Sequence, residues 1–330
     1  MIKIINPRAK LTDDLFSASI KKMGTRDGYG HALLELARED PRIVALTADL
    51  PESTRVLAFK KEFPDRFFDT GVAEQNMVGI AAGLALEGKI PFAASFGVFS
   101  PALTWGQIRL SVCYNDANAK IVASHTGTTT GADGASHQAT EDIAIMRCLP
   151  NMIVLVPCDY LDTKKATIAA AEYKGPVYLR FGRDKVAAIT TEQTPFKIGR
   201  AEVFREGKDI TLVACGIMVY EALKAAAELD KEGVSARVIN NHTIKPLDKE
   251  TILEAAKETG AFVTAEEHQI MGGMGSAVTE FLAAHHPIPV EMVGLKDTFG
   301  ESGSPKELME KYGLTSKNIV EAAQRVLKRK

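Results

Sequence analysis

The sequence predicts an α/β protein of two doubly wound domains, and three observations lead to that prediction. Short apolar runs alternate along the 330 residues with longer segments of helical periodicity, which is the pattern of sheets layered between helices. The apolar runs are continuous rather than alternating, as in parallel strands buried on both faces. A polar segment that contains a proline, residues 187–196, divides these runs into two groups.

Nine apolar runs are predicted to form strands. Five precede the polar segment: Ile43–Thr47, Phe92–Ser95, Lys120–Ser124, Met152–Pro157 and Val177–Phe181. Four follow it: Ile210–Cys215, Ala236–Asn241, Ala261–Ala265 and Val290–Leu295. We therefore expect an N-terminal arm over residues 1–19, a first domain over 20–188, a linker over 189–197 and a second domain over 198–330.

The segments between these strands have the signals of helices. Residues 29–38 have helical periodicity and end shortly before a proline. Residues 221–229 and 249–259 are followed by Gly233 and Gly260, and glycine is the preferred residue after a helix C-terminus. Strands and helices in this alternation favour right-handed crossover connections.

Composition and charge exclude several classes of protein. Hydrophobic residues make up 45% of the chain and charged residues 25%, which excludes global disorder. Forty basic against 42 acidic residues leave a net charge of −2, so we expect no general nucleic-acid binding. No apolar run approaches the ~20 residues of a membrane-spanning helix, and the N-terminus lacks an apolar signal segment. The four scattered cysteines indicate reduced thiols and a cytoplasmic protein.

Residues 69–84 contain a single carboxylate after Asp69, Glu74, at the start of a helix of otherwise small and apolar residues. One interpretation is a glutamate that interacts favourably with the helix dipole. The other is a carboxyl group in a dry, tightly packed setting, where desolvation raises its pKa. A carboxyl group of the second kind can hold and transfer a proton, as an acid–base catalyst must.

The loop from Ser124 to Gln138 follows a predicted strand and is rich in glycine, threonine and serine, with His125, Asp133 and His137 among them. Loops at the carboxyl ends of parallel strands are where α/β proteins bind ligands. Two histidines at this spacing are not a metal signature, so we expect no metal site in this chain. The pattern favours a polar pocket for a hydroxylated ligand, and a flexible surface loop is the alternative.

Two further segments contain candidate binding residues. Arg180 lies at the end of a predicted strand, where its planar guanidinium could bind a phosphate or carboxylate through two hydrogen bonds. A structural ion pair is the alternative for this arginine. Phe96 and Phe99 follow another strand and could wall an aromatic ligand ring or belong to the core. The glycines of residues 266–275 lack the spacing of a dinucleotide-binding turn.

Together and in this order, these segments resemble the transketolase family of thiamine-diphosphate enzymes, and in particular the C-terminal subunit of a split, two-chain transketolase. The resemblance extends over nearly the whole chain. Its motifs in the first half are Ala48-Asp-Leu, Gly71-Val-Ala-Glu-Gln-Asn-Met-Val-Gly, Ile108-Arg-Leu-Ser, Gly131-Ala-Asp-Gly-Ala-Ser-His-Gln and Leu149-Pro-Asn-Met. Those in the second half are Arg237-Val-Ile-Asn-Asn-His-Thr-Ile-Lys-Pro-Leu-Asp and Ala265-Glu-Glu-His.

The resemblance implies a thiamine-diphosphate pyrimidine-binding domain over residues 20–188 and a transketolase C-terminal domain over 198–330. It makes Glu74 the catalytic glutamate, which shares a proton with N1′ of the cofactor's aminopyrimidine ring. The other cofactor-binding positions that it implies are Phe96 and Phe99 around that ring and Asp49 in the cofactor cleft.

The resemblance also implies how a sugar phosphate is bound. The positions that match phosphate-binding residues are Arg26, Ser53, His125 and Arg180. The positions that match contacts to substrate hydroxyls are Asp133 and His137, and His125 and His137 are both expected to take part in catalysis. The implied activity is the transfer of a two-carbon ketol unit from a ketose phosphate to an aldose phosphate, as in the pentose phosphate pathway.

A partner subunit follows from what the chain lacks. The family binds Mg²⁺ and diphosphate through a Gly-Asp-Gly motif and a later asparagine, and no Gly-Asp-Gly occurs here. We therefore expect thiamine diphosphate and Mg²⁺ to be held mainly by a separate N-terminal subunit, in an α2β2 heterotetramer that is active only when complete. Departures from the family pattern at Gly106, Ala132 and Thr128–Thr130 bear on substrate preference.

Three other assignments stay open at this point. The β chain of a 2-oxoacid dehydrogenase E1 component resembles this chain in its two domains, but it has no need for the full set of phosphate-binding residues. The C-terminal half of a deoxyxylulose-phosphate synthase is part of one long chain. A catalytically silent scaffolding subunit is a different class of protein, and it would not require a carboxyl group such as Glu74 in an apolar pocket.

Overall fold

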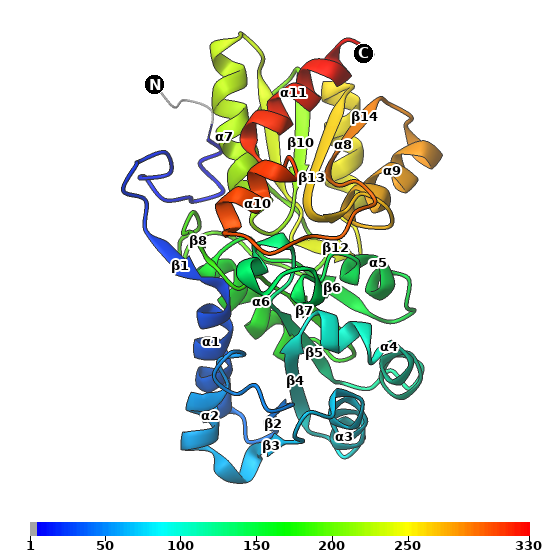
Figure 1. Cartoon of the computed structure of the whole chain (residues 1–330). Helices are drawn as coiled ribbons and strands as arrows, with labels where there is room; N and C mark the ends of the chain where they lie inside the picture. The colour runs from blue at the N-terminus through cyan, green and yellow to red at the C-terminus, as the bar shows by residue number, and fades with distance from the viewer. Residues whose placement is uncertain (1–4) are drawn as a thin grey trace.

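The computed structural model describes residues 5–330, which form two α/β halves stacked one above the other (Figure 1). The N-terminal half is at the bottom of the figure and the C-terminal half is at the top, and each is built on its own main sheet. The predicted α/β class with two domains is thereby confirmed. Within residues 5–330, no helix combines the length and the apolar character needed to cross a membrane.

The sheet of the N-terminal half has the strand order β12-β6-β7-β5-β4-β2-β3. Its parallel strands are β2 (Ile43–Thr47), β3 (Phe67–Asp69), β4 (Ile90–Phe96), β5 (Lys120–Ser124), β6 (Ile153–Leu155) and β7 (Val177–Arg180). Every residue of β2, β4 and β5 is buried, which accounts for their continuous apolar sequences. Because these strands are parallel, the loops that follow them meet at one edge of the sheet.

Helices cover both faces of this sheet. One face is covered by α1 (Thr25–Glu39), α2 (Leu57–Glu62) and α6 (Tyr160–Glu172). The other is covered by α3 (Glu74–Leu86), α4 (Trp105–Gln107) and α5 (Asp142–Arg147). Leu33 and Phe59 are buried on the first face, and Met77 and Ile143 on the second. Removing this much apolar surface from water is the main driving force for folding of the half.

The sheet of the C-terminal half has the order β14-β13-β10-β11-β9. Its strands are β9 (Glu202–Arg205), β10 (Ile210–Ala214), β11 (Ala236–Asn240), β13 (Phe262–Gln269) and β14 (Val290–Leu295). One face packs against α7 (Met218–Lys231) and α11 (Ser316–Leu327), and the other against α8 (Lys249–Thr259) and α9 (Met274–His285). A further helix, α10 (Pro305–Lys311), extends from this half toward residues 128–133 of the other half.

The structure contains short strands that the sequence did not predict. β1 (Lys22–Gly24) and β8 (Lys185–Ala187) pair as an antiparallel ribbon. β12 (Thr243–Lys245), which comes from the C-terminal half, extends the first sheet beside β6. These strands, like β3 and β9, are three or four residues long and lie at edges. A strand this short has no apolar run long enough to identify it in the sequence.

The N-terminal arm lies against the C-terminal half. The amide of Asn6 donates to the carbonyl of Phe204 at 3.0 Å, and the amide of Thr12 donates to the carbonyl of Ile189 at 3.0 Å. Residues 1–4 of the predicted arm lie outside the described residues. These two hydrogen bonds connect the start of the chain to the C-terminal half and to the segment that precedes it.

A neutral histidine is buried in the C-terminal half. His242 follows β11 and is fully buried. Its ring stacks on that of Phe196 with 4.1 Å between centroids, and its Nδ1 lies 3.0 Å from the Thr243 hydroxyl. Burial lowers the pKa of His242 to about 3. In the unfolded chain the same imidazole binds a proton below about pH 6.5.

We expect His242 to make the folded state less stable as the pH falls below about 6.5, because the unfolded chain then binds a proton that the folded chain does not. The loss approaches ~1.4 kcal/mol per pH unit for one such group. Replacing His242 with Gln should remove this contribution, measured as the free energy of unfolding in urea at pH 7.5 and pH 5.5. The same difference between the two pH values in H242Q and in the wild-type chain would contradict the assignment.

Candidate functional site

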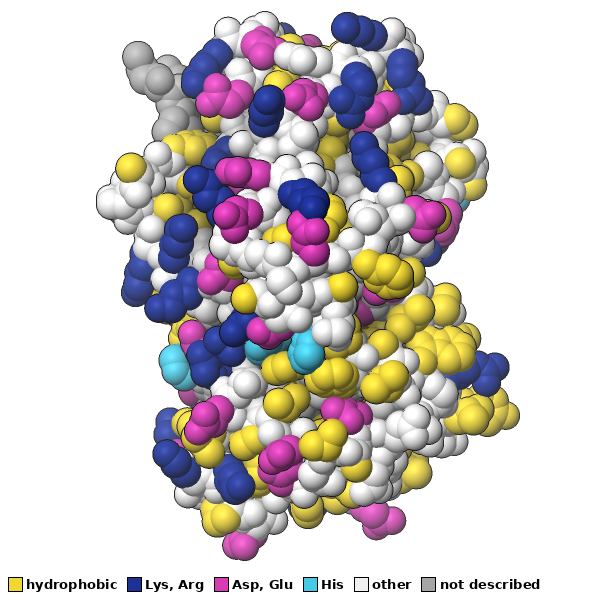
Figure 2. Space-filling view, viewed as in Figure 1, with side chains coloured by type: hydrophobic (Ala, Val, Ile, Leu, Met, Phe, Trp, Pro, Cys, Tyr) yellow, Lys and Arg dark blue, Asp and Glu magenta, His cyan; other side chains and the backbone are white. Residues whose placement is uncertain are grey.

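The candidate site lies at the carboxyl edge of the first sheet, where the loops after β5 and β7 contact the C-terminal half. We call residues 126–138, between β5 and α5, the threonine loop. Figure 2 shows histidine side chains beside lysine and arginine side chains at the level where the two halves meet. The position agrees with the expectation that ligands bind at the carboxyl ends of parallel strands.

Four of the predicted site residues form a cluster of rings. Phe96, at the end of β4, stacks on His125 with 3.8 Å between centroids and on Phe99 with 5.8 Å. The ring of His137 meets Phe99 edge-on at 5.4 Å. Phe96 and His125 are buried, whereas Phe99 and His137 are partly exposed. The cluster therefore presents two of its rings to the outside, as a wall for a flat ligand would.

Positive charges gather beside this ring cluster. Burial and, to a smaller extent, the charges of Arg26, Arg183, His137 and Arg55 together lower the pKa of His125 to about 3. Burial and the neighbouring Arg55 also lower the pKa of Arg26. Arg55 and Arg183 both disfavour the charge of Arg26. We call these three residues the arginine cluster, and an anion bound beside them would stabilise their charges.

The arginines come from different elements that the fold brings together. Arg26 is the second residue of α1, and its Nη1 donates to the carbonyl of Ser53 at 3.1 Å. The hydroxyl of Thr25 donates to the carbonyl of Gly182 at 3.2 Å, which holds the start of α1 beside Arg183. The predicted pair Arg26 and Ser53 is thus adjacent in the structure.

Arg183 is a further candidate site residue, which the sequence interpretation did not name. Its Nη1 donates to the carbonyl of Thr130 at 2.9 Å and lies 3.1 Å from the carboxylate of Asp133. The side chain is partly exposed and interacts with His125. Its position in the sequence could have indicated this role, because Arg183 follows Gly182 beyond the end of β7 and its side chain is not packed within the sheet.

Arg180 is the last residue of β7, as predicted, and its side chain forms a buried ion pair. Its side chain is buried, its Nε donates to Asp142 at 2.7 Å, and its Nη2 donates to the carbonyl of Glu267 at 2.9 Å. The hydroxyl of Tyr178 donates to the same carboxylate at 2.6 Å. The structure therefore supports the ion-pair alternative for Arg180 instead of a phosphate contact, because β7 is an interior strand and its last residue is covered by the C-terminal half.

Glu74 is the first residue of α3, as predicted, but it is partly exposed and not packed in a dry setting. Its helix buries Met77 and Val78 on the side of the sheet, and the opposite side is open. Asp49, in the loop after β2, is exposed and has a positive φ of 59°. Its amide donates to the carboxylate of Asp69 at 2.9 Å, which holds that turn.

The surface around α3 is apolar and uncovered in this chain. A side chain added at Gly79 or Gly83 would meet only open space. The exposed large hydrophobic residues nearby in the sequence are Val72, Leu86, Leu103, Leu110 and Tyr114. Figure 2 shows hydrophobic side chains gathered at the lower right, in the region of α3 and α4. An exposed apolar surface of this kind marks a site of protein association.

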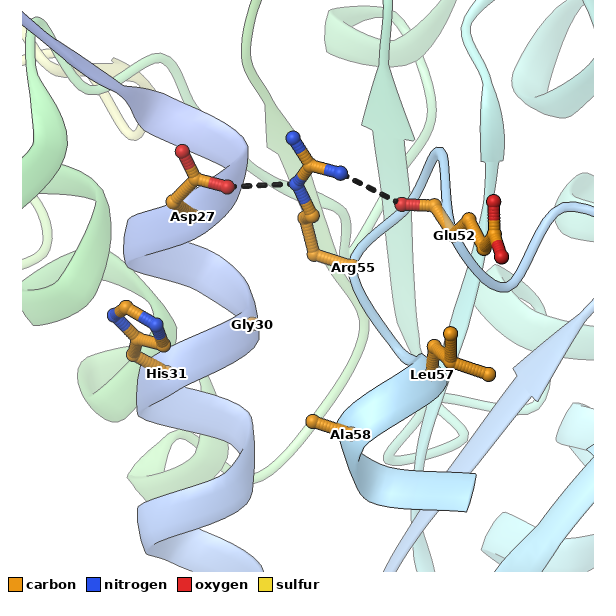
Figure 3. Close-up of a pocket in the computed structure, with 7 residues that line it drawn as sticks. All are labelled: Asp27, Gly30, His31, Glu52, Arg55, Leu57 and Ala58. Carbon is orange, nitrogen blue, oxygen red and sulfur yellow. Dashed lines mark hydrogen bonds and ion pairs between the residues drawn. The ribbon is translucent and has the colours of Figure 1, made fainter. Parts of the chain in front are cut away.

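A pocket of about 330 Å³ opens between α1 and α2 (Figure 3). Arg55 crosses it, with its Nε 2.6 Å from Asp27 and its Nη1 donating to the carbonyl of Glu52 at 3.1 Å. The backbone of Arg55 lies so close to α1 that a Cβ at Gly30 would come within 2.7 Å of its carbonyl oxygen. The pocket therefore adjoins the arginine cluster, since Arg55 belongs to both.

Comparison with protein-family models assigns both halves. The model "Transketolase, pyrimidine binding domain" matches residues 21–188, and the model "Transketolase, C-terminal domain" matches residues 199–319. Among curated proteins, the chain is 45% identical to the 6-deoxy-6-sulfo-D-fructose transketolase subunit SqwH of Clostridium sp. (strain MSTE9), over 96% of this chain and 98% of that one. It is 46% identical to a putative transketolase C-terminal section of Methanocaldococcus jannaschii, over 93% and 97%.

A similar solved structure is described as a split-gene transketolase, an inactive beta4 tetramer. It is 51% identical in sequence and superposes with a TM-score of 0.87, over 93% of this chain and 99% of that one. A single relative of similar length thus has both halves of the present chain in a similar arrangement.

We expect Arg180 and Arg183 to differ sharply in their effect on stability. Replacing Arg180 with Ala leaves the carboxylate of Asp142 buried without its partner, which costs about 3–5 kcal/mol. Replacing Arg183 with Ala removes a partly exposed ion pair, which costs less than about 1 kcal/mol. Urea unfolding of the two variants measures the difference directly. Equal losses would contradict the separate roles given to these two residues.

Proposed function

The chain belongs to the transketolase family as a subunit of the split type, and on this premise we propose that it supplies the pyrimidine half of a thiamine-diphosphate site for ketol transfer. A separate chain supplies the half that binds diphosphate and Mg²⁺. The observation that carries the proposal is the convergence of the ring cluster and the arginine cluster on His125. One set of residues suits a flat ring, and the other suits the anionic end of a sugar.

The residues of this chain fit the aminopyrimidine part of the cofactor. Phe96 and Phe99 stack on each other with 5.8 Å between centroids and leave the outer ring accessible. The side-chain amide of Gln75, beside Glu74, donates to the carbonyl of Leu103 at 3.1 Å, which connects the start of α3 to the segment that follows Phe99. This contact supports a site in which the carboxyl group and the ring wall act on one ligand, with Asp49 at its margin.

The chain's own residues then have defined tasks. The carboxyl group of Glu74 holds a proton that it shares with N1′ of the aminopyrimidine ring. When bound, thiamine diphosphate supplies the carbon nucleophile and the electron sink for cleaving a carbon–carbon bond. Asp133 accepts a hydrogen bond from a substrate hydroxyl, and His137 forms a hydrogen bond with another. His125 is kept neutral by burial and by its arginine neighbours, so its ring can donate one hydrogen bond and accept one.

The arginine cluster is proposed to hold the terminal anionic group of the substrate. Arg26 and Arg183 take the two charged positions beside Ser53, and Arg183 replaces Arg180 in this role. A guanidinium binds the oxygens of a phosphate or of a sulfonate with two parallel hydrogen bonds. The relative that acts on a 6-deoxy-6-sulfo sugar makes both anions reasonable substrate groups for this cluster.

The apolar surface around α3 is proposed to be the contact with the partner subunit. Covering it would also remove water from Glu74, so the carboxyl group would reach the dry setting that proton transfer requires only in the assembly. The proposed working unit is an α2β2 heterotetramer. The beta4 tetramer of the split-gene relative is inactive, and we propose that this chain, without its partner, uses the same surface to associate with copies of itself.

The proposal is tested by mixing the purified chain with an N-terminal transketolase subunit from the same source. We expect ketol transfer from a ketose phosphate only in the mixture, with weak binding of thiamine diphosphate to this chain alone in calorimetry. In the mixture, replacing Glu74 with Gln should lower kcat by about 10²–10⁴. Size-exclusion chromatography should show the assembly unchanged.

The matched control is Glu87→Gln, an exposed carboxylate at the other end of the same helix. It should leave kcat unchanged, because it is remote from the ring cluster. Turnover by the chain alone would contradict the split site. Full turnover in E74Q would remove Glu74 from the mechanism and favour a subunit that only supports assembly.

We expect Arg183→Ala in the complete complex to raise KM for phosphorylated donors by about 10-fold to 100-fold. This is the effect expected when one charge-assisted hydrogen bond to the substrate is lost. Donors without a terminal anion should be affected much less, because they make no contact with the guanidinium. Steady-state kinetics with one donor of each kind measures the effect. An equal rise of KM for both donors would contradict the anion assignment.

A further inference from the structure

The threonine loop carries Asp133 and His137 and contacts Arg183, yet its first turn is held from the other half of the molecule. We propose that Glu267, at the end of β13, is the positioning residue of this loop and thereby sets the geometry of the substrate-binding residues. The inference rests on the proposed function for what the loop binds. It gives the C-terminal half a task in the active site.

The carboxylate of Glu267 binds the start of the loop directly. Its Oε1 accepts a hydrogen bond from the amide of Thr129 at 2.5 Å and one from the hydroxyl of Thr128 at 3.1 Å. All three residues are buried. Two donors on one carboxylate oxygen fix both the position and the orientation of the turn, since each bond alone would leave it free to rotate.

The backbone of the loop is built to receive this carboxylate. Gly127 has a positive φ of 78°, and a Cβ added there would lie 2.2–2.5 Å from the carboxyl atoms of Glu267. Only glycine permits both the conformation and this close approach. The fit between Gly127 and Glu267 is therefore specific, and it does not depend on general packing between the halves.

A second segment of the C-terminal half holds the far end of the loop. The side-chain amide of Gln138 donates to the carbonyls of Thr128 and Glu301, at 3.1 and 3.0 Å. A Cβ at Gly134 would lie 2.7 Å from the hydroxyl of Ser302. The loop is thus enclosed between β13 on one side and residues 301–302 on the other, and its shape depends on both.

The position of the loop reaches the substrate through Arg183. The carbonyl of Thr130, one residue beyond the anchored turn, accepts a hydrogen bond from Nη1 of Arg183 at 2.9 Å. Asp133 lies 3.1 Å from the same guanidinium. A displacement of residues 128–130 would therefore move a charge of the arginine cluster and the carboxylate proposed to bind a substrate hydroxyl. Within the Thr128–Thr130 run, the hydroxyl of Thr128 has a structural role, because it donates to Glu267.

The neighbouring carboxylate provides a matched control. Glu266 lies on the same strand and is equally buried, but its oxygens accept hydrogen bonds from the amides of Met274 and Gly275 in its own half, at 2.6 and 2.8 Å. Removing either carboxyl group should reduce stability by leaving buried donors unpaired. Only Glu267 has its donors in the threonine loop.

The test compares Glu267→Ala, Glu267→Gln, Thr128→Val and Glu266→Ala in the complex with the partner subunit. In E267A we expect hydrogen exchange of peptides from residues 126–138 to become at least about 10-fold faster. KM for a ketose phosphate should rise about 10-fold while kcat changes less than about 3-fold. E267Q should stay within about 3-fold of the wild type, because the amide oxygen can still accept both bonds. T128V, which removes one donor and not the other, should fall between them.

Three outcomes would overturn the inference: wild-type exchange of the loop in E267A, an equal change in E266A, or E267Q as impaired as E267A. If E267A does not fold, the measurements on E267Q and T128V decide whether Glu267 positions the loop. A T128V variant with the KM and the loop exchange rate of the wild type would then contradict the positioning role of Glu267. The exchange measurement does not need activity. A wild-type complex without ketol transfer would therefore contradict the proposed function, while the exchange data would still decide whether Glu267 positions the loop.

Discussion

The buried Arg180, which pairs with Asp142 in its own half and donates to the other half, is a central contact between the two halves of this protein. Arg180 ends β7 in the first sheet, pairs with Asp142 at 2.7 Å and donates to the main chain of Glu267 at 2.9 Å. A buried charge must be paired and hydrogen-bonded, so the end of β7, the start of α5 and the end of β13 are held in one arrangement. The loops at the carboxyl edge of the first sheet therefore also contact β13 of the second sheet.

On the proposed function, the chain presents one half of an active site beside this contact. The ring cluster and the arginines are assembled within a single chain, and His125 links them. The catalytic carboxyl proposed at Glu74 instead lies on the margin of an uncovered apolar surface. On the proposed function, this division couples chemistry to assembly: the carboxyl group loses its water only when another subunit covers α3, so that free chains have no complete site.

Much of the fold could be predicted from the sequence, and the exceptions share a physical cause. β2 and β5 have the predicted bounds, because strands buried on both faces come from near-continuous apolar runs. The edge strand β14 also has the predicted bounds, although its first three residues are only partly buried. β3, β9 and β12 were not predicted, since an edge strand of three or four residues has no apolar run long enough to identify it. The joining of β12 to the first sheet is likewise a pairing between distant segments, which no local pattern records.

The sequence by itself determined the α/β class, the two halves, the family and the loops that carry the candidate site, because apolar periodicity and motif order are local properties of the chain. The tertiary structure decided how two arginines three residues apart are used: Arg180 is buried against Asp142 and the main chain of Glu267, whereas Arg183 is partly exposed beside Asp133, where the proposed function places an anion. It also decided that a carboxylate from the C-terminal half holds the threonine loop. Both outcomes depend on burial by residues distant in sequence, and burial is a property of the folded chain.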